Sequence, residues 1–368
     1  MKFFKLLLVI IFSAAIFCVN CNAVENSAVS AIVINADTFS VIFSKNAETR
    51  MPMASTTKIM TALILAEQNT PQKTVSTTKE MVYVEGSSMG LKVGDTVTYE
   101  DLLYGIMLPS GNDAANTAAL AISGSIKSFA ELMNQKAKSF GLHNTNFVTP
   151  SGLDAENHFT TAYDLAVITA YALRNENFLK VASTKNKQVT ISGNKVALQN
   201  HNKLLKMYEG AIGVKTGYTK RSGRCLVSAA KRGNTTLIAV TLNDKNDWQD
   251  HIALLDYGFS KTEETVIIPQ VNKYLPLLSS PQMSIELQFE PLEIGANNED
   301  ITYEVFLPQV VSAPIEKGDI IGLTKFFANG RHITTKNIIA KYTYKSEIIN
   351  ANFFDRLANV YLYLIRSI

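Results

Sequence analysis

Four serines in this chain stand three residues before a lysine, a spacing that could pair a nucleophile with its base. They are Ser55, Ser76, Ser192 and Ser228. In a helix, residues three apart share a face, so the lysine amine can reach the hydroxyl and take its proton. In an extended segment the two side chains point to opposite faces. Because composition alone yields roughly one or two such matches in a chain of this length, local context must identify the reactive copy.

Ser55 has the context that this chemistry needs. Pro52 precedes it, and residues 55–67 carry apolar side chains with few polar gaps, which predicts a helix buried nearly all round. Unpaired N–H groups at the start of a helix favour negative charge on the serine oxygen. Lys58 is a base only when neutral, so its pKa must fall from about 10.4 through burial and a second nearby cation.

The other three copies lack this context. Ser76 lies in a threonine-rich segment, residues 74–84, whose alternation predicts an extended backbone that faces solvent. Ser192 lies in a polar, hairpin-like turn, and Ser228 lies in a strand that ends at Lys231. We therefore expect only Ser55 to act as a nucleophile.

Two further triplets complement Ser55 and Lys58. Ser110-Gly111-Asn112 forms a turn between two predicted helices and presents a hydroxyl and an amide together, whereas Ser192-Gly193-Asn194 has no flanking helices. Lys215-Thr216-Gly217 occurs once, on a predicted strand, where the glycine would allow close approach of a ligand backbone. Lys215 is a second cation that could lower the pKa of Lys58. Together the triplets predict a single cleft.

Hydrophobic periodicity predicts the elements that must position these triplets. Alternation indicates two N-terminal strands and, after Gly210, three more, at residues 29–34, 39–43, 211–219, 225–231 and 235–242. Helical spacing indicates helices at residues 55–67, 99–107, 113–123, 129–140, 161–173 and 247–259. From about residue 265, short apolar alternations between Pro and Gly turns predict a small all-β domain, and residues 350–368 return to a helical pattern.

Length and the N-terminus bound the class of protein. A chain of 368 residues, 46% hydrophobic and 18% charged, predicts two globular units. Residues 1–23 combine Lys2 and Lys5 with an apolar run and end in Cys-Asn-Ala, which predicts a cleaved signal peptide and an exported protein. A lipoprotein reading through Cys18 or Cys21 is weaker, because neither cysteine follows a small-residue lipobox pattern.

Charge, cysteines and histidines exclude several functions. Loss of the two leader lysines lowers the formal charge from +3 to +1, which argues against a nucleic-acid partner. Cys225 is then the single remaining cysteine, so an intramolecular disulfide is impossible. The five histidines lack metal-site spacing, and we expect surface or loop positions for them and neither a metal nor a cofactor. They are His143, His158, His201, His251 and His332.

The triplets and their neighbours resemble those of low-molecular-mass penicillin-binding proteins, the serine-type D-alanyl-D-alanine carboxypeptidases. The resemblance extends over nearly the whole chain. It includes Pro-Met-Ala-Ser-Thr-Thr-Lys-Ile-Met-Thr at residues 52–61, Met-Leu-Pro-Ser-Gly-Asn-Asp-Ala at 107–114, Gly-Leu-Asp at 152–154 and Gly-Val-Lys-Thr-Gly-Tyr-Thr at 213–219.

This resemblance implies an α+β protein with a penicillin-binding, β-lactamase-like transpeptidase fold, in which an antiparallel sheet is flanked by helices. The expected order is a signal peptide (1–23), a catalytic domain (24–262), a small all-β domain (263–346) and an amphipathic helix (347–368). Asp355 and Arg356 interrupt any membrane span and lie largely off the apolar face of this helix, which favours an interfacial helix docked on the outer face of the cytoplasmic membrane. Packing of the helix on its own β domain is the alternative.

The resemblance also implies the roles of the site residues. Ser55 would attack the terminal D-Ala-D-Ala carbonyl, Lys58 would take its proton, and Ser110 and Lys215 would relay it to the leaving amine. Asn112 would hold the peptide carbonyl. Lys215 and Thr216 would bind the terminal carboxylate, with Gly217 admitting the ligand. The N–H groups of Ser55 and Tyr218 would form the oxyanion hole. The expected partners are peptidoglycan stem peptides and, as covalent inhibitors, β-lactams.

Three functions other than a carboxypeptidase are considered for these residues. A D,D-endopeptidase or transpeptidase would use the same residues, and a wall-binding protein with a dead site would keep them unused. A class A β-lactamase is disfavoured because no Glu-x-x-Leu-Asn segment lies between the second and third triplets. Arg221 and Arg224 are either carboxylate ligands or solvated turn charges.

Overall fold

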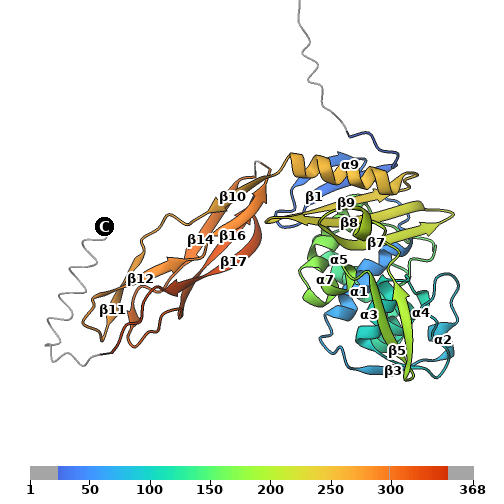
Figure 1. The fold of residues 1–368 in the computed structure, drawn as a ribbon, viewed down its shortest axis with the longest axis horizontal. Coiled ribbons are helices and arrows are strands. Elements are labelled where there is room, and N and C mark those ends of the chain that lie inside the picture. Colours follow the sequence, from blue (N-terminus) through green and yellow to red (C-terminus); the bar gives the residue numbers. More distant parts are fainter. Residues whose placement is uncertain (1–23, 298, 347–368) are drawn as a thin grey trace, which may run out of the picture.

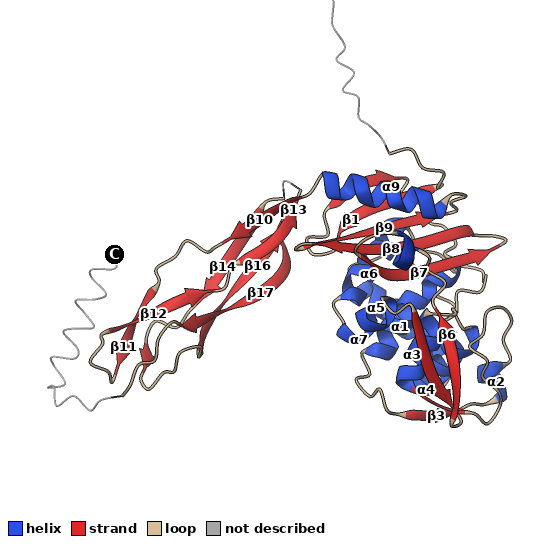
Figure 2. Ribbon diagram, viewed as in Figure 1, coloured by secondary structure: helices blue, strands red, loops and turns tan. Residues whose placement is uncertain are grey.

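The computed structural model describes residues 24–297 and 299–346, which form two units joined end to end (Figure 1). The first unit combines a central antiparallel sheet with helices, and the second is built from strands (Figure 2). The predicted leader, residues 1–23, and the predicted helix at residues 347–368 lie outside the described residues. Within the described ranges, we find no helix that has both the length and the hydropathy to cross a bilayer.

The sheet of the first unit has the strand order β2-β1-β9-β8-β7, and each neighbouring pair is antiparallel. Its strands are β1 (Ser30–Asn35), β2 (Val41–Lys45), β7 (Ala211–Thr219), β8 (Gly223–Arg232) and β9 (Thr235–Leu242). The chain leaves the sheet after β2, builds the helical part and returns at β7. The strand that carries Lys215-Thr216-Gly217 is therefore at the sheet's edge.

The two faces of the sheet belong to different cores because strand side chains alternate. On β1, Ile32 and Ile34 pack with the helical part, whereas Ala31 and Val33 pack with α9 (Asp247–Ser260). Helix α9 lies along one face, where Leu204 joins the same core, and the other helices of this unit cover the opposite face (Figure 1). This sandwich fixes the edge strand β7 beside the helices that carry the other two triplets.

The helical part begins with a 3-10 turn, η1, that leads directly into the buried helix α1. Its elements are η1 (Ala54–Thr57), α1 (Lys58–Ala66), α2 (Lys79–Val82), α3 (Tyr99–Met107), α4 (Asn112–Ser123), α5 (Ile126–Ser139), α6 (Ala162–Leu173), α7 (Glu176–Ala182) and α8 (Leu204–Met207). Two hairpins accompany them, β3 (Thr74–Ser76) with β4 (Thr96–Thr98), and β5 (Asn186–Ile191) with β6 (Asn194–Gln199). Every residue of α1 is buried, as predicted.

Two local predictions are wrong. The second strand begins at Val41 rather than Phe39, because Phe39 has φ +63° and its amide donates to the Asn35 carbonyl in a turn. The segment 74–84 is extended only through Ser76 and then enters α2. Burial of Met81 and Val82 on α2 outweighs the alternating pattern that suggested a strand.

The second unit is all-β, as predicted. Its strands are β10 (Glu263–Ile267), β11 (Tyr274–Leu278), β12 (Ser284–Phe289), β13 (Leu292–Ala296), β14 (Ile301–Phe306), β15 (Val311–Ser312), β16 (Ile320–Ala328) and β17 (Arg331–Ala340). Six of them form a sheet in the order β14-β16-β17-β12-β11-β15, and β10 pairs with β13. The Asn35 side-chain amide donates to the Gly295 carbonyl at 2.7 Å, and the Arg331 guanidinium lies 3.7 Å from the Phe39 ring centroid. These contacts join the two units at the end of the sheet where β1 ends and β9 begins.

Candidate active site

Ser55 lies in the 3-10 turn that precedes α1, and Lys58 is the first residue of α1. The preceding residue, Ala54, has φ +47°, a left-handed conformation that is rare for a residue with a side chain. The Lys58 amine lies 3.0 Å from Ser55 Oγ. The turn therefore brings the hydroxyl and the amine into direct hydrogen-bond contact.

Two further acceptors surround the Lys58 amine. It donates to Asn112 Oδ1 at 2.6 Å and to the Ser151 carbonyl at 2.6 Å. Burial lowers the pKa of Lys58 well below its usual value, and the charge of Lys215 lowers it further, against an opposing effect of Asp113. A neutral amine has two N–H bonds and one lone pair. If Asn112 and Ser151 accept the two N–H bonds, the lone pair points to Ser55.

The corner between α3 and α4 presents Ser110 to the same cleft. Ser110 is 4% exposed and has φ +64°, and its hydroxyl finds no hydrogen-bond partner among the described residues. A buried, unpaired hydroxyl is costly and rare in folded proteins. Asn112 begins α4, and its Nδ2 donates to the Glu85 carbonyl at 2.6 Å, which leaves a second N–H on that nitrogen. The Ser110 hydroxyl and the second N–H of Asn112 are therefore both available to a ligand.

Strand β7 packs directly against the turn that holds Ser55. A Cβ added at Gly217 would lie 3.0 Å from the Ser55 nitrogen and 3.1 Å from the Ala54 Cβ, so a glycine suits this approach. Lys215 is 1% exposed, and its amine donates to the Thr216 carbonyl at 3.0 Å. Burial lowers the pKa of Lys215 to about 7. The second cation is therefore itself close to losing its proton at neutral pH.

These segments line one cavity of about 320 Å³. Its lining comprises Ser55, Ser87, Ser110, His201, Thr216, Gly217, Tyr218, Arg224, Asp247 and Trp248. Three further site residues lie beneath this surface. The exposed fraction is 0% for Lys58, 4% for Asn112 and 1% for Lys215. The structure thus gathers all three triplets at one place, the arrangement on which the predicted chemistry depends.

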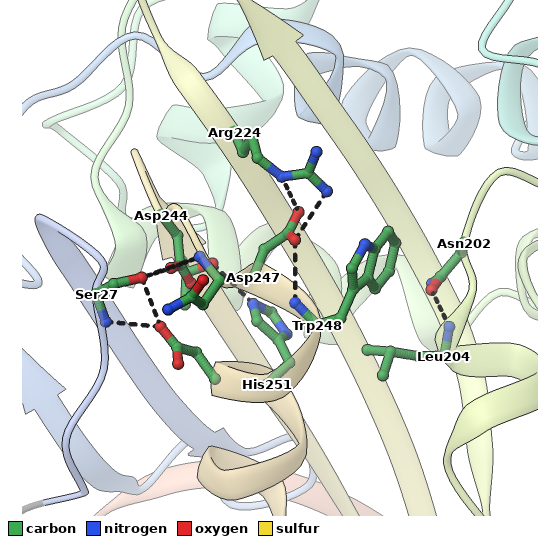
Figure 3. A network of polar contacts seen from close by, with 11 residues as sticks. Ser27, Asn202, Leu204, Arg224, Asp244, Asp247, Trp248 and His251 are labelled. Carbon is green, nitrogen blue, oxygen red and sulfur yellow. Dashed lines mark hydrogen bonds and ion pairs between the residues drawn. The ribbon is translucent and has the colours of Figure 1, made fainter.

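Asp247 and Trp248 belong to the cavity wall and were not identified from sequence, whereas Arg224 was one of two arginines considered as carboxylate ligands. Arg224 on β8 donates through Nε and Nη2 to the carboxylate of Asp247, at 3.0 and 2.8 Å (Figure 3). The Trp248 backbone N–H donates to the same carboxylate at 3.0 Å. The hairpin register places Arg224 opposite Tyr218, so the alternation of β7 and β8 could have indicated it. Arg221 instead donates to the Ala155 carbonyl at 3.3 Å.

The other Ser-x-x-Lys copies lie elsewhere. Ser76 is exposed on β3, and Ser192 is exposed at the β5–β6 turn, where it donates to Asp95. Ser228 is buried on β8, and its hydroxyl lies 2.5 Å from Nδ1 of His251. Of the four copies, Ser55 is the one that lines the cavity described above, and its role as the nucleophile stays a prediction.

The prediction of surface or loop positions for the histidines is wrong for His251, whereas the loop position of His158 agrees with it. His251 lies inside α9 with no exposed surface, and His158 is a loop residue that is only 5% exposed. Both rings are held by hydroxyl groups, Ser228 and Thr241 around His251 and Thr57 beside His158. The described residues contain no group of three or more His, Cys, Asp or Glu side chains that could hold a metal ion.

A family profile and individual relatives identify the same protein family for this chain. The profile of the peptidase S11 family, described as D-alanyl-D-alanine carboxypeptidase, matches residues 18–246. The chain is 34% identical to the D-alanyl-D-alanine carboxypeptidase DacF of Bacillus subtilis, over 86% of this chain and 85% of that protein. It is 33% identical to DacC of Escherichia coli, over 86% and 83% of the two chains.

Solved structures extend the likeness to the fold. A DD-transpeptidase from Streptomyces matches with a TM-score of 0.61 and 35% identity, over 64% of this chain and 98% of that one. Penicillin binding protein 5 from Haemophilus influenzae matches with a TM-score of 0.63 and 26% identity, over 88% and 98% of the chains. The second match therefore includes both the sheet-and-helix unit and the all-β unit.

Proposed function

Because this chain belongs to the D-alanyl-D-alanine carboxypeptidase family, peptidase S11, we propose that Ser55 is the nucleophile with which it removes the terminal D-alanine of a peptidoglycan stem peptide. The chain is a serine-type hydrolase of the α+β penicillin-binding fold. Ser55 Oγ attacks the carbonyl carbon of the D-Ala-D-Ala bond, the C–N bond breaks, and D-alanine leaves. Water then hydrolyses the ester on Ser55 and restores the hydroxyl.

The observation that carries this proposal is the fully buried Lys58 amine, 3.0 Å from Ser55 Oγ. Burial and the neighbouring Lys215 charge favour the neutral amine, which can accept the serine proton as the C–O bond forms. Asn112 and Ser151 hold the amine in place through its N–H bonds. Lys58 is accordingly the general base for acylation.

The leaving amine of D-alanine needs a proton when the C–N bond breaks. Ser110 supports a relay, because its buried hydroxyl is unpaired within the described ranges and lines the cavity with Ser55. It would receive the proton from Lys58 and pass it to the amine nitrogen, and Lys215 can replenish the relay because its pKa lies at about 7. Deacylation would run the same path in reverse with water.

Binding groups complete the assignment. The N–H groups of Ser55 and Tyr218 would hold the developing oxyanion, and the remaining N–H of Asn112 would hold the peptide carbonyl. Thr216 and protonated Lys215 would bind the terminal carboxylate. Arg224 supports the same role more strongly than Arg221, because it lines the cavity and Asp247 holds only its Nε and Nη2 edge. Its Nη1 is left for a ligand carboxylate.

The endopeptidase or transpeptidase alternative is not favoured, since the family and the two curated relatives above are named carboxypeptidases. β-Lactams would acylate Ser55 as substrate mimics. Peptidoglycan lies outside the cytoplasm, so the enzyme acts there. Export through a leader at residues 1–23 and peripheral membrane docking through a helix at residues 347–368 complete the proposal.

Fluorescent penicillin and a stem pentapeptide test the assignment together. Wild-type protein should form a covalent penicillin adduct and release D-alanine, and Ser55→Ala should do neither while remaining folded. Ser76→Ala, in the other copy of Ser-Thr-Thr-Lys, should retain both activities because its hydroxyl is exposed on β3. Labelling that survives Ser55→Ala would reject the nucleophile. Mass spectrometry of muropeptide products would reject carboxypeptidase activity if only cross-links changed.

A further inference from the structure

His158 is a buried titratable side chain that the mechanism above does not use. It lies in the loop between α5 and α6, 101 residues from Thr57 in sequence, and its Nε2 is 2.8 Å from the Thr57 hydroxyl. The backbone N–H of Val148 points at Nδ1 of the same ring, at 2.9 Å. Since a backbone amide can only donate, Nδ1 is the acceptor and the ring proton is on Nε2.

This tautomer gives the hydrogen bonds a single direction. Nε2–H of His158 donates to Thr57 Oγ1, and the Thr57 hydroxyl donates to the Ala54 carbonyl at 2.8 Å. Burial lowers the pKa of His158 to about 4, so the ring is neutral and keeps this direction at physiological pH. The chain of bonds therefore runs from the Val148 amide to the carbonyl immediately before Ser55.

The Ala54 carbonyl and the Ser55 N–H belong to one planar peptide group. Fixing the direction of that carbonyl fixes the direction of the N–H on the opposite side of the bond. Ala54 has φ +47°, a conformation that costs of order 1–3 kcal/mol and persists only where surrounding contacts hold it. Gly152, from the same loop as His158, packs so closely on the Ala54 carbonyl that a Cβ there would collide with it.

We propose that His158 is a positioning residue, which acts through Thr57 and the Ala54 carbonyl to aim the Ser55 N–H at the substrate oxyanion. The inference rests on the proposed role of Ser55. His158 touches neither substrate nor nucleophile in this arrangement. Its effect should appear in the chemical steps rather than in binding, because the aimed N–H gains strength as negative charge develops on the substrate oxygen.

Thr57→Val tests the link and has a matched control in the adjacent residue. Valine keeps the shape of threonine but cannot donate to Ala54. Thr56 is equally buried, and its hydroxyl donates to the Met53 carbonyl at 2.5 Å, which does not belong to the Ser55 peptide group. We expect Thr57→Val to lower kcat and the penicillin acylation rate roughly tenfold to a hundredfold with KM little changed. Thr56→Val should change both less than about threefold.

Four further variants separate positioning from folding. Thr57→Ser keeps the hydroxyl and should restore kcat to near wild type. His158→Leu should lower kcat, and His158→Gln, whose amide can donate to Thr57, should recover part of the loss. His158→Leu added to Thr57→Val should cost little more, because both act on one chain of bonds. Far-UV circular dichroism and melting temperature establish which variants are folded.

The outcomes distinguish this proposal from the assignment of Ser55. If wild-type protein is not labelled on Ser55, the nucleophile assignment fails and the positioning role falls with it. If wild type is labelled but folded Thr57→Val reacts at the wild-type rate, only the positioning role is wrong. Equal losses in Thr56→Val and Thr57→Val, or a loss confined to KM, would likewise contradict it.

Discussion

Acid should destabilise the sheet-and-helix unit through His251, a histidine with no exposed surface inside α9. Its ring lies between the hydroxyls of Ser228 and Thr241, at 2.5 and 2.9 Å. Burial lowers its pKa to about 3, against a smaller opposing effect of Asp250. In the unfolded chain the pKa returns to about 6.5. The unfolded state therefore takes up a proton first as the pH falls.

The sign and size of the effect follow from this difference. The stability contributed by neutral His251 is fully present above pH 6.5 and is lost progressively as the pH falls toward the folded pKa of about 3. Between pH 6.5 and pH 4, about 2.5 pH units, the unfolded state carries a proton on His251 that the folded state does not. Each pH unit in this range lowers the free energy of unfolding by about 1.4 kcal/mol, so the total decrease is about 3 kcal/mol. That is a large part of the roughly 5–15 kcal/mol by which domains are stable.

Urea unfolding at pH 7 and pH 4, followed by the fluorescence of Trp248, measures this loss. Trp248 is the single tryptophan of the chain and lies on the same helix as His251. His251→Gln removes the titrating ring but can still bond to the hydroxyls, so its stability should fall about 3 kcal/mol less than that of wild type between the two pH values. Carboxylates contribute equally to both proteins and cancel.

His143→Gln, at an exposed histidine, is the control and should follow wild type. Equal losses in wild type and His251→Gln would refute the reasoning, because the acid sensitivity would then come from other groups.

Three further predictions concern the cleft. Gly152→Ala should lower the free energy of unfolding by on the order of 3 kcal/mol or more and slow acylation, because its Cβ would meet the Ala54 carbonyl. Gly193→Ala, with a similar φ of +81° but open space around it, should cost only about 1 kcal/mol. Similar urea midpoints for the two variants would contradict the clash. In the proposed mechanism Lys215 binds the terminal carboxylate only when protonated, and its pKa is about 7, so kcat/KM for a stem pentapeptide should decline above that pH. A C-terminally amidated peptide should show a weaker decline because only the relay role of Lys215 remains, and identical alkaline limbs for the two peptides would reject the carboxylate-binding role. Trp248 lines the cavity, so penicillin acylation should change its emission in wild type and not in Ser55→Ala, and an unchanged spectrum on full labelling would place the acyl group elsewhere.

Much of the site could be predicted from local sequence. The placement of Ser55 and Lys58 at the start of a buried helix, the corner at residues 110–112 and the strand at 211–219 each depend on short-range periodicity and turn chemistry. Helices α3 and α4 and strand β9 begin and end within one residue of the predicted bounds. These patterns survive because local preference and tertiary packing agree at those segments.

Contacts between distant segments could not be predicted in this way. Lys58 meets the Ser151 carbonyl across 93 residues, and Thr57 meets His158 across 101. The orientation of the Arg224 guanidinium at the cleft depends on Asp247, at the start of α9, which accepts two hydrogen bonds from it. Sequence alone therefore determined which groups could react and on which elements they lie. The tertiary structure decided their protonation and aim, because both depend on desolvation and on hydrogen bonds from segments that folding brings together.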